Sequence, residues 1–183
     1  MGTDYAVPPA GLHTVDDESQ FNGTPQHYEW KLLGKREMLV PYHNFRINDP
    51  ALKYDALIKP GTVNPDYVRY ELHRVWVIEG KLKPGLRHVY GRRVLYADED
   101  TWLPLWADNY DMRAQLFRTS FVNWFYSQES STFHRGVTVY HDLSSGAYEA
   151  TYLVNQAGAG WWRLNQKFPL SMFTPEAAAR GGH

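Results

Sequence analysis

The chain of 183 residues carries 19 lysines and arginines against 20 aspartates and glutamates, a formal net charge of −1. This balance argues against a large basic surface for nucleic acid. The absence of cysteine excludes disulfides, thiolate zinc sites, iron–sulfur clusters and cysteine nucleophiles. The length fits one domain with its own hydrophobic core. Aromatic residues make up 15% of the chain (7 Trp, 13 Tyr and 8 Phe), and the fold has to accommodate their large side chains.

The first 27 residues show neither helical nor strand periodicity, and they include the acidic run Asp16-Asp17-Glu18. We therefore expect an irregular arm over 1–27, followed by a single antiparallel β domain over 28–183. The beginning of the sequence has no basic region followed by an apolar one, so no signal peptide is expected. No apolar run approaches the ~20 residues that span a bilayer, so no transmembrane segment is expected either.

From Tyr28 onward, runs of β-branched and aromatic residues alternate with short turn signals such as Lys83-Pro84-Gly85, which is typical of an antiparallel meander. The predicted strands are 28–40, 68–82, 86–97, 101–109, 114–127, 134–143 and 147–154. A strand of about 14 residues is roughly 46 Å long, so these lengths favour a tall, strongly curved sheet or an open barrel over a compact sandwich. The fold class we predict is mostly β, a long-stranded curved meander with long loops and little helix.

Two further segments complete the predicted organisation. The stretch 41–66 is rich in proline and turn residues, and we expect a long loop that either carries function or covers a face of the sheet. A single helical turn is expected at 175–180, with Thr174 before it as a capping residue.

The strand 68–82 has one apolar and one polar face, because side chains alternate along a strand. The apolar set is Tyr70, Leu72, Trp76, Ile78 and Leu82. Arg74 falls on this same face, and a charge there requires a carboxylate partner or an acidic group of a ligand. Asp108 and Asp142 are the candidate partners, and Arg118 is a second cation in a similar position. These four residues form either an internal ion-pair network that fixes strand register or polar anchors inside a pocket.

Motifs of catalysis and metal binding are missing from the sequence. The histidines lack HxH, HxxxH and HExxH spacing, and there is no GxSxG segment, so we assign no catalytic residue, no metal ligand and no cofactor. The basic stretch 87–93 alternates along a predicted strand, and we interpret it as a solvated strand face, not a surface for single-stranded nucleic acid. We expect a protein that is not an enzyme.

The aromatic residues allow two interpretations. They can pack a core, as in many sheet proteins. Alternatively they line one concave face of a curved sheet and hold a lipid-like or other apolar ligand. The candidate ligand-binding residues are Tyr70, Trp76, Tyr90, Trp102, Trp106, Phe117, Phe121 and Trp124.

Several runs of the sequence resemble a known family. WKLLGKREMLVPY from Trp30, YELHRVWV from Tyr70, Arg87-His88-Val89-Tyr90, and YADEDTW from Tyr96 are similar to a bacterial envelope family of unknown function that is labelled "outer membrane lipoprotein-sorting protein". The segment Phe173-Thr174-Pro175-Glu176-Ala177 continues the match, which runs from about Tyr28 to the end of the chain.

The resemblance implies a periplasmic, non-enzymatic protein with a half-open antiparallel barrel like that of the Lol lipoprotein carriers. In such folds a curved sheet holds acyl chains beneath a helical or loop lid. Family members are generally exported and longer, and this chain matches only their C-terminal portion. The sheet is then expected to have an open edge, which can pair with another chain or with the missing N-terminal half of the fold.

Two hypotheses about function follow from these observations. The first is a binding or carrier module that holds an apolar ligand on the concave face of its sheet. The second is a structural subunit that docks onto a larger assembly through the arm 1–27 and the open sheet edge.

Overall fold

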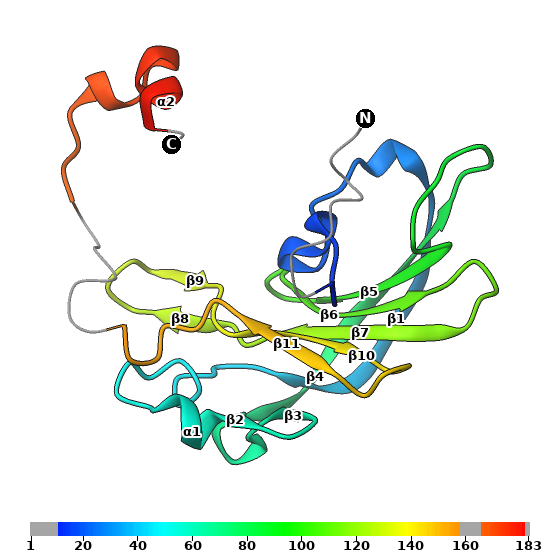
Figure 1. Ribbon diagram of the computed structural model, residues 1–183, viewed down its shortest axis with the longest axis horizontal. Helices are drawn as coiled ribbons and strands as arrows, with labels where there is room; N and C mark the ends of the chain where they lie inside the picture. The colour runs from blue at the N-terminus through cyan, green and yellow to red at the C-terminus, as the bar shows by residue number, and fades with distance from the viewer. Residues whose placement is uncertain (1–10, 158–165, 182–183) are drawn as a thin grey trace.

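A computed structural model describes residues 11–157 and 166–181, and its main element is one antiparallel sheet of seven strands. The strand order is β1-β4-β5-β6-β7-β10-β11, so neighbours in the sheet follow each other along the chain, as the predicted meander requires (Figure 1). The bounds are β1 Tyr28–Pro41, β4 Tyr70–Leu82, β5 Arg92–Asp98, β6 Pro104–Tyr110, β7 Leu116–Val122, β10 Thr138–Asp142 and β11 Tyr148–Thr151.

The smaller elements lie in the connections. Two hairpins are formed by β2 Ile58–Lys59 with β3 Thr62–Val63, and by β8 Phe125–Ser127 with β9 Thr132–His134. The helical segments are η2 Val15–Gln20, η3 Pro25–His27, α1 Tyr54–Leu57, η4 Pro65–Tyr67, η5 Leu170–Met172 and α2 Pro175–Gly181. The predicted helical turn at 175–180 is therefore confirmed. The predicted strand 114–127 is divided into β7 and β8, and residues 86–91 belong to a loop.

The first two strands of the sheet are much longer than the others. β1 has 14 residues and β4 has 13, and they pair along their full length. A bulge between Leu32 and Gly34 shifts their register, and Gly34 adopts a φ of +112° that favours glycine. Beyond the bulge the parity of β1 is reversed, so Leu32 and Leu39 share a face although their numbers differ by an odd amount.

The loop 42–69 covers one face of the sheet, here called the loop-covered face. Ile47, Leu57 and Val63 from this loop are buried against Phe121 and Val139 of the sheet. A second cluster on the same face joins Val40, Tyr42, Val75, Val94 and Tyr96. Two roles are expected as alternatives for the stretch 41–66, and the structure shows one of them, the covering of a sheet face. The side chains buried under this stretch form part of the core.

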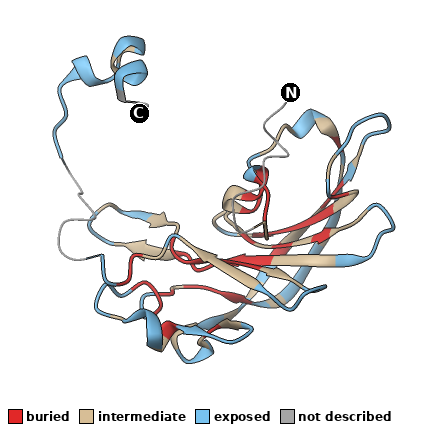
Figure 2. Ribbon diagram, in the orientation of Figure 1, coloured by how far each residue is buried: buried red, intermediate tan, exposed pale blue. Residues whose placement is uncertain are grey.

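The opposite face, here called the arm-covered face, lies on the inner side of the bend and holds the N-terminal arm (Figure 1). The described part of the arm buries Asp16, Asp17 and Gln20 against the middle strands, where the buried residues concentrate (Figure 2). Residues 1–10 of the predicted arm lie outside the described part of the chain. β1 and β11 stand at the two ends of the strand order and do not pair with each other, so the sheet is open, as in a half-open barrel.

The burial of the two faces of β4 differs from what the alternation of apolar and polar residues predicts. Val75 is fully buried on the face that the sequence marks as polar, while Leu72 on the apolar face is 65% exposed. The reason is that Val75 packs in a core cluster with Tyr42 and Trp124, whereas the arm reaches only part of the face of Leu72. Within the described residues, no helix is long and apolar enough to cross a membrane.

Candidate functional site

The arm is fixed to the sheet by a buried ion-pair network around Arg93 of β5. Arg93 is 0% exposed, and its guanidinium pairs with the carboxylates of Asp16 and Asp17. His88 Nε2 lies 3.1 Å from Asp16 Oδ2, and the Tyr90 hydroxyl donates to Asp17 Oδ2 at 2.6 Å. The interpretation of stretch 87–93 as a solvated face is therefore wrong for Arg93, because the arm brings two carboxylates onto it.

Burial and charge act in opposite directions on the carboxylates of this network. Burial alone would raise the pKa of Asp16, but the hydrogen bond from His88 and the charge of Arg93 outweigh it and hold that pKa below its usual value. Burial raises the pKa of Tyr28, which packs beside the network, to about 12. The network thus joins two carboxylates of the arm to a buried guanidinium of the sheet, which makes it a means of attaching the arm to the sheet.

The arm leaves part of its own face uncovered, along β1 and β4. There Leu39 pairs with Leu72 across the two strands, and the side chains are 62% and 65% exposed. Tyr70 lies next on the same face and is 44% exposed. Toward the arm the row continues with Trp76 of β4 and with Trp102 of the β5–β6 turn, whose rings stack with centroids 5.7 Å apart. We call Leu39, Tyr70, Leu72, Trp76 and Trp102 the apolar strip.

Trp102 has an unusual conformation for a large residue. Its φ is +61°, in the left-handed region that favours glycine, and its side chain is 65% exposed. Its backbone N–H donates to the carbonyl of Asp98 in the tight turn. The backbone therefore holds a tryptophan on the surface in a conformation that glycine would adopt at lower cost.

Charged groups lie between the two ends of the apolar strip. Arg74 Nη2 donates to Glu99 Oε1 at 2.8 Å, and Lys35 Nζ lies 3.1 Å from the same oxygen atom. Lys35 also lies over the Trp76 ring, 4.1 Å from its centroid. The Arg74 side chain is 61% exposed and not interior, so burial does not force it to pair. Its carboxylate partner is Glu99 and not Asp108 or Asp142, because the turn after β5 brings Glu99 beside β4.

The second predicted cation has one of the predicted partners. Arg118 Nε lies 3.5 Å from Asp142 Oδ2, and Arg118 Nη2 donates to the carbonyl of Gly11 in the arm at 2.7 Å. Asp108 accepts instead from the hydroxyls of Tyr96 and Thr119. Arg118 and Asp142 thus form an ion pair that helps to position the arm, whereas Asp108 belongs to a separate group of hydrogen bonds.

The eight candidate aromatic residues are divided between several surroundings. Tyr70, Trp76 and Trp102 belong to the apolar strip. Trp106 stacks on Phe121 at 5.0 Å beneath the loop 42–69, and Trp124 is buried in the other core cluster. Tyr90 and Phe117 lie together near the arm, 5.7 Å apart. Of the eight, Tyr70 and Trp102 are exposed. Trp76, Trp106 and Phe117 are of intermediate exposure, and Tyr90, Phe121 and Trp124 are buried.

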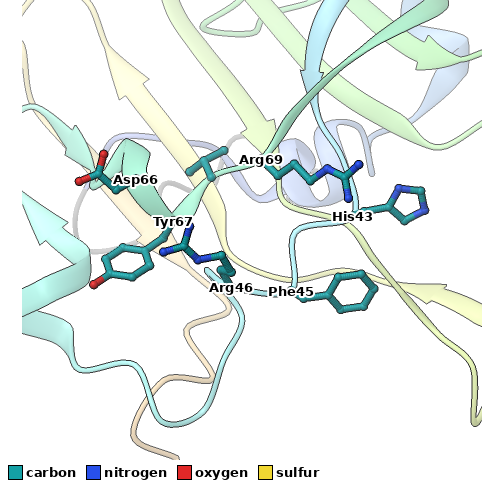
Figure 3. Close-up of a pocket in the computed structure, with 7 residues that line it drawn as sticks. His43, Phe45, Arg46, Asp66, Tyr67 and Arg69 are labelled. Carbon is teal, nitrogen blue, oxygen red and sulfur yellow. The ribbon is translucent and has the colours of Figure 1, made fainter.

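A separate cavity of about 390 Å³ lies where β1 ends and β4 begins (Figure 3). Its wall is formed by His43, Phe45, Arg46, Asp66, Tyr67, Val68 and Arg69. Asn44 holds the two segments together, because its side chain accepts from Arg69 N at 2.7 Å and donates to Arg69 O at 3.1 Å. The prediction from sequence did not include this cavity, since its residues belong to loop segments that are distant in sequence.

Glu71 neutralises part of the positive charge at this cavity. Its carboxylate lies 2.9 Å from His43 Nδ1 and 3.3 Å from Arg69 Nε. Arg46 lies over the Tyr67 ring, 5.4 Å from its centroid, and no ion pair of Arg46 with a carboxylate occurs among residues 11–157 and 166–181. In the same ranges, no group of three or more histidine, aspartate and glutamate side chains is arranged to hold a metal ion.

The comparisons with known proteins agree on the fold. A crystal structure of a DUF1329 family protein from Desulfovibrio piger is similar to this chain with a TM-score of 0.50 at 14% identity, over 97% of this chain and 57% of that one. The crystal structure of a putative outer membrane lipoprotein-sorting protein domain from Vibrio parahaemolyticus gives a TM-score of 0.50 at 11% identity, over 89% of this chain and 55% of that one.

One curated relative is similar in sequence. The uncharacterized protein PA3922 of Pseudomonas aeruginosa is 38% identical over 174 residues, which cover 94% of this chain and 38% of the relative. The chain thus spans well under half the length of that protein. The model of the family described as "Protein of unknown function (DUF1329)" matches residues 3–179, and the chain therefore belongs to this family.

Proposed function

We propose that this chain is a non-enzymatic module of the bacterial cell envelope that binds a lipid-like or other apolar ligand on the apolar strip. The observation that carries the proposal is the exposed cross-strand pair Leu39 and Leu72, with Tyr70 beside it on the inner side of the bend. The likeness in fold to a putative outer membrane lipoprotein-sorting domain supports the same class of function.

The energetics of the strip support a ligand. Burying one exposed leucine side chain contributes about 1.5–3 kcal/mol, and three neighbouring apolar side chains can be buried together on this surface. Single exposed leucines are ordinary on protein surfaces, but contiguous apolar patches usually mark binding sites. A chain-like ligand laid across Leu39 and Leu72 would bury both side chains.

The strained tryptophan supports the same proposal. Trp102 is held at a positive φ with most of its surface in water, and such strained positions cluster at binding sites. With Trp76 it forms a stacked pair at the end of the strip nearest the arm. The paired charges of Lys35, Arg74 and Glu99 flank the rings and offer polar contacts to a ligand that has a polar end.

Equilibrium binding of the fluorescent fatty acid cis-parinaric acid tests the proposal. Leu72→Glu places a charge between Leu39 and Tyr70, in the exposed apolar part of the strip, and is expected to weaken binding at least about tenfold. Leu143→Glu is the matched control, because Leu143 is also about half exposed but lies in the β10–β11 turn. Equal affinity of both variants and the original chain would contradict the proposal.

As a second function we propose a role as a structural subunit that pairs through the outer edge of β1. In the described residues β1 pairs with β4 alone, so one side of a 14-residue strand has no neighbouring strand. The described part of the arm is bound to its own sheet, which leaves the edge as the docking element. Light scattering coupled to size exclusion tests self-pairing, and a monomer at all concentrations would count against it.

A further inference from the structure

We infer that the cavity between the end of β1 and the start of β4 is a binding site for a small organic anion with an aromatic or apolar body. The inference rests on the charge, the shape and the rigidity of the cavity, and it concerns a different surface from the apolar strip. The residues that carry it are Arg46, Phe45 and Tyr67 (Figure 3).

One of the two arginines of the cavity wall, Arg46, forms no ion pair with a carboxylate among the described residues. His43 and Arg69 share the single carboxylate of Glu71, while Arg46 has no carboxylate partner among the described residues. Figure 3 shows the Asp66 carboxylate directed away from both arginines. A guanidinium offers a planar row of donors that matches a carboxylate, sulfonate or phosphate group, so Arg46 is the group that would receive the charged end of the ligand.

The remaining wall is suited to an apolar body. Phe45 is exposed beside the cavity, and the Tyr67 ring lies under the Arg46 guanidinium. The Phe45 ring also contacts Phe125 of the β8–β9 hairpin, with centroids 6.3 Å apart, which restrains its orientation. At about 390 Å³ the cavity falls in the usual range of small-molecule sites, and it has room for a body of one or two rings.

The backbone around the cavity is held in place before any ligand binds. The two hydrogen bonds of Asn44 with Arg69 lock the segment after β1 to the segment before β4. His43 adopts a φ of +49°, an uncommon conformation for a residue with a side chain. The side chains of His43, Phe45 and Arg46 therefore project from a rigid backbone, which lowers the entropic cost of binding.

The test measures binding of three probes to the full chain by isothermal titration calorimetry. The probes are 2-naphthoate, its neutral analogue 2-naphthamide, and inorganic phosphate. We expect 2-naphthoate to bind at least about tenfold more tightly than either of the others, because only this probe supplies both an anion and an apolar body. Equal affinity for the naphthamide would exclude an anion site, and equal affinity for phosphate would exclude a site for an organic body.

Two variants assign the site to Arg46. Arg46→Gln removes the charge and is expected to weaken 2-naphthoate binding about tenfold or more. Arg36→Gln is the matched control, because Arg36 is also an exposed arginine over a tyrosine ring, 4.6 Å from the centroid of Tyr96, but lies outside the cavity. Unchanged affinity in Arg46→Gln, or an equal loss in Arg36→Gln, would overturn the inference. Leu72→Glu is expected to leave 2-naphthoate binding unchanged, which separates this site from the apolar strip.

Discussion

Arg93 in the middle of the sheet and Asp17 in the N-terminal arm form an ion pair from which water is excluded on both sides. The two residues are 76 positions apart in the sequence. The charge of Arg93 is compensated by carboxylates of the arm, and the charge of Asp17 is compensated by the guanidinium from the sheet. The arm is therefore a structural part of the fold, because it both covers the Arg93 guanidinium and supplies the carboxylates that pair with it.

Arg93→Ala tests the importance of this pair for stability. Removing the guanidinium leaves Asp16 and Asp17 buried without their main partner, and we expect a loss of about 3–5 kcal/mol in the free energy of unfolding. Lys81→Ala, which removes the exposed partner of Glu79, should cost less than about 1 kcal/mol. Urea denaturation followed by tryptophan fluorescence measures both, and similar effects of the two substitutions would contradict the buried network.

Acid should destabilise the protein through two carboxylates, that of Asp16 in the arm and that of Asp98 at the end of β5. The pKa of Asp16 and that of Asp98 both lie below the ordinary value of 3.8, although burial alone would raise each of them. A carboxyl group whose pKa is lower in the folded state stabilises the fold above its unfolded pKa, and this contribution is lost as the pH falls through the folded pKa. We expect the free energy of unfolding to decline as the pH is lowered below about 4.

The variant Asp16→Asn tests how much Asp16 contributes to this pH dependence. It removes one titrating group, so stability between pH 3 and pH 5 should vary less steeply than in the original chain. Glu29→Gln, in an exposed position of β1, provides the control. Parallel curves for Asp16→Asn and the original chain would show that Asp16 does not contribute to the acid transition.

Trp102 should matter more for binding than for stability. Trp102→Gly removes the stacking contact with Trp76 but also relieves the positive φ, so we expect a change of less than about 1.5 kcal/mol in the free energy of unfolding. The affinity for cis-parinaric acid should fall in the same variant. A large loss of stability with unchanged affinity would show that Trp102 serves packing alone.

Gly136 should resist any side chain. A Cβ atom at this position would lie 2.1 Å from Asn48 Oδ1, and Asn48 accepts from Val137 N and donates to the carbonyls of Asn44 and Asn123. We expect Gly136→Ala to cost about 2 kcal/mol or more, because the methyl group displaces the amide that ties the loop 42–69 to the sheet. A double-mutant cycle with Asn48→Ala checks the cause, and additive effects would contradict it.

The sequence predicts the strands well because alternation and turn residues are local properties. The sequence places β4 correctly, but it does not predict which face of β4 is covered. Val75 is buried in a cluster with Tyr42 and Trp124, which come from other parts of the chain. The role of Arg93 was likewise missed, although one signal was present in the acidic run Asp16-Asp17-Glu18, which the arginine-rich stretch 87–93 complements in charge. Long-range contacts of this kind decide which of the predicted aromatic residues remain accessible.

The central claim is that the apolar strip holds a ligand, and native mass spectrometry of the protein purified without detergent tests it most directly. The account predicts a bound apolar or lipid-like molecule that is released by organic solvent and is depleted in Leu72→Glu but not in Leu143→Glu. A protein that is reproducibly empty, and that takes up no fatty acid when one is added, would contradict it.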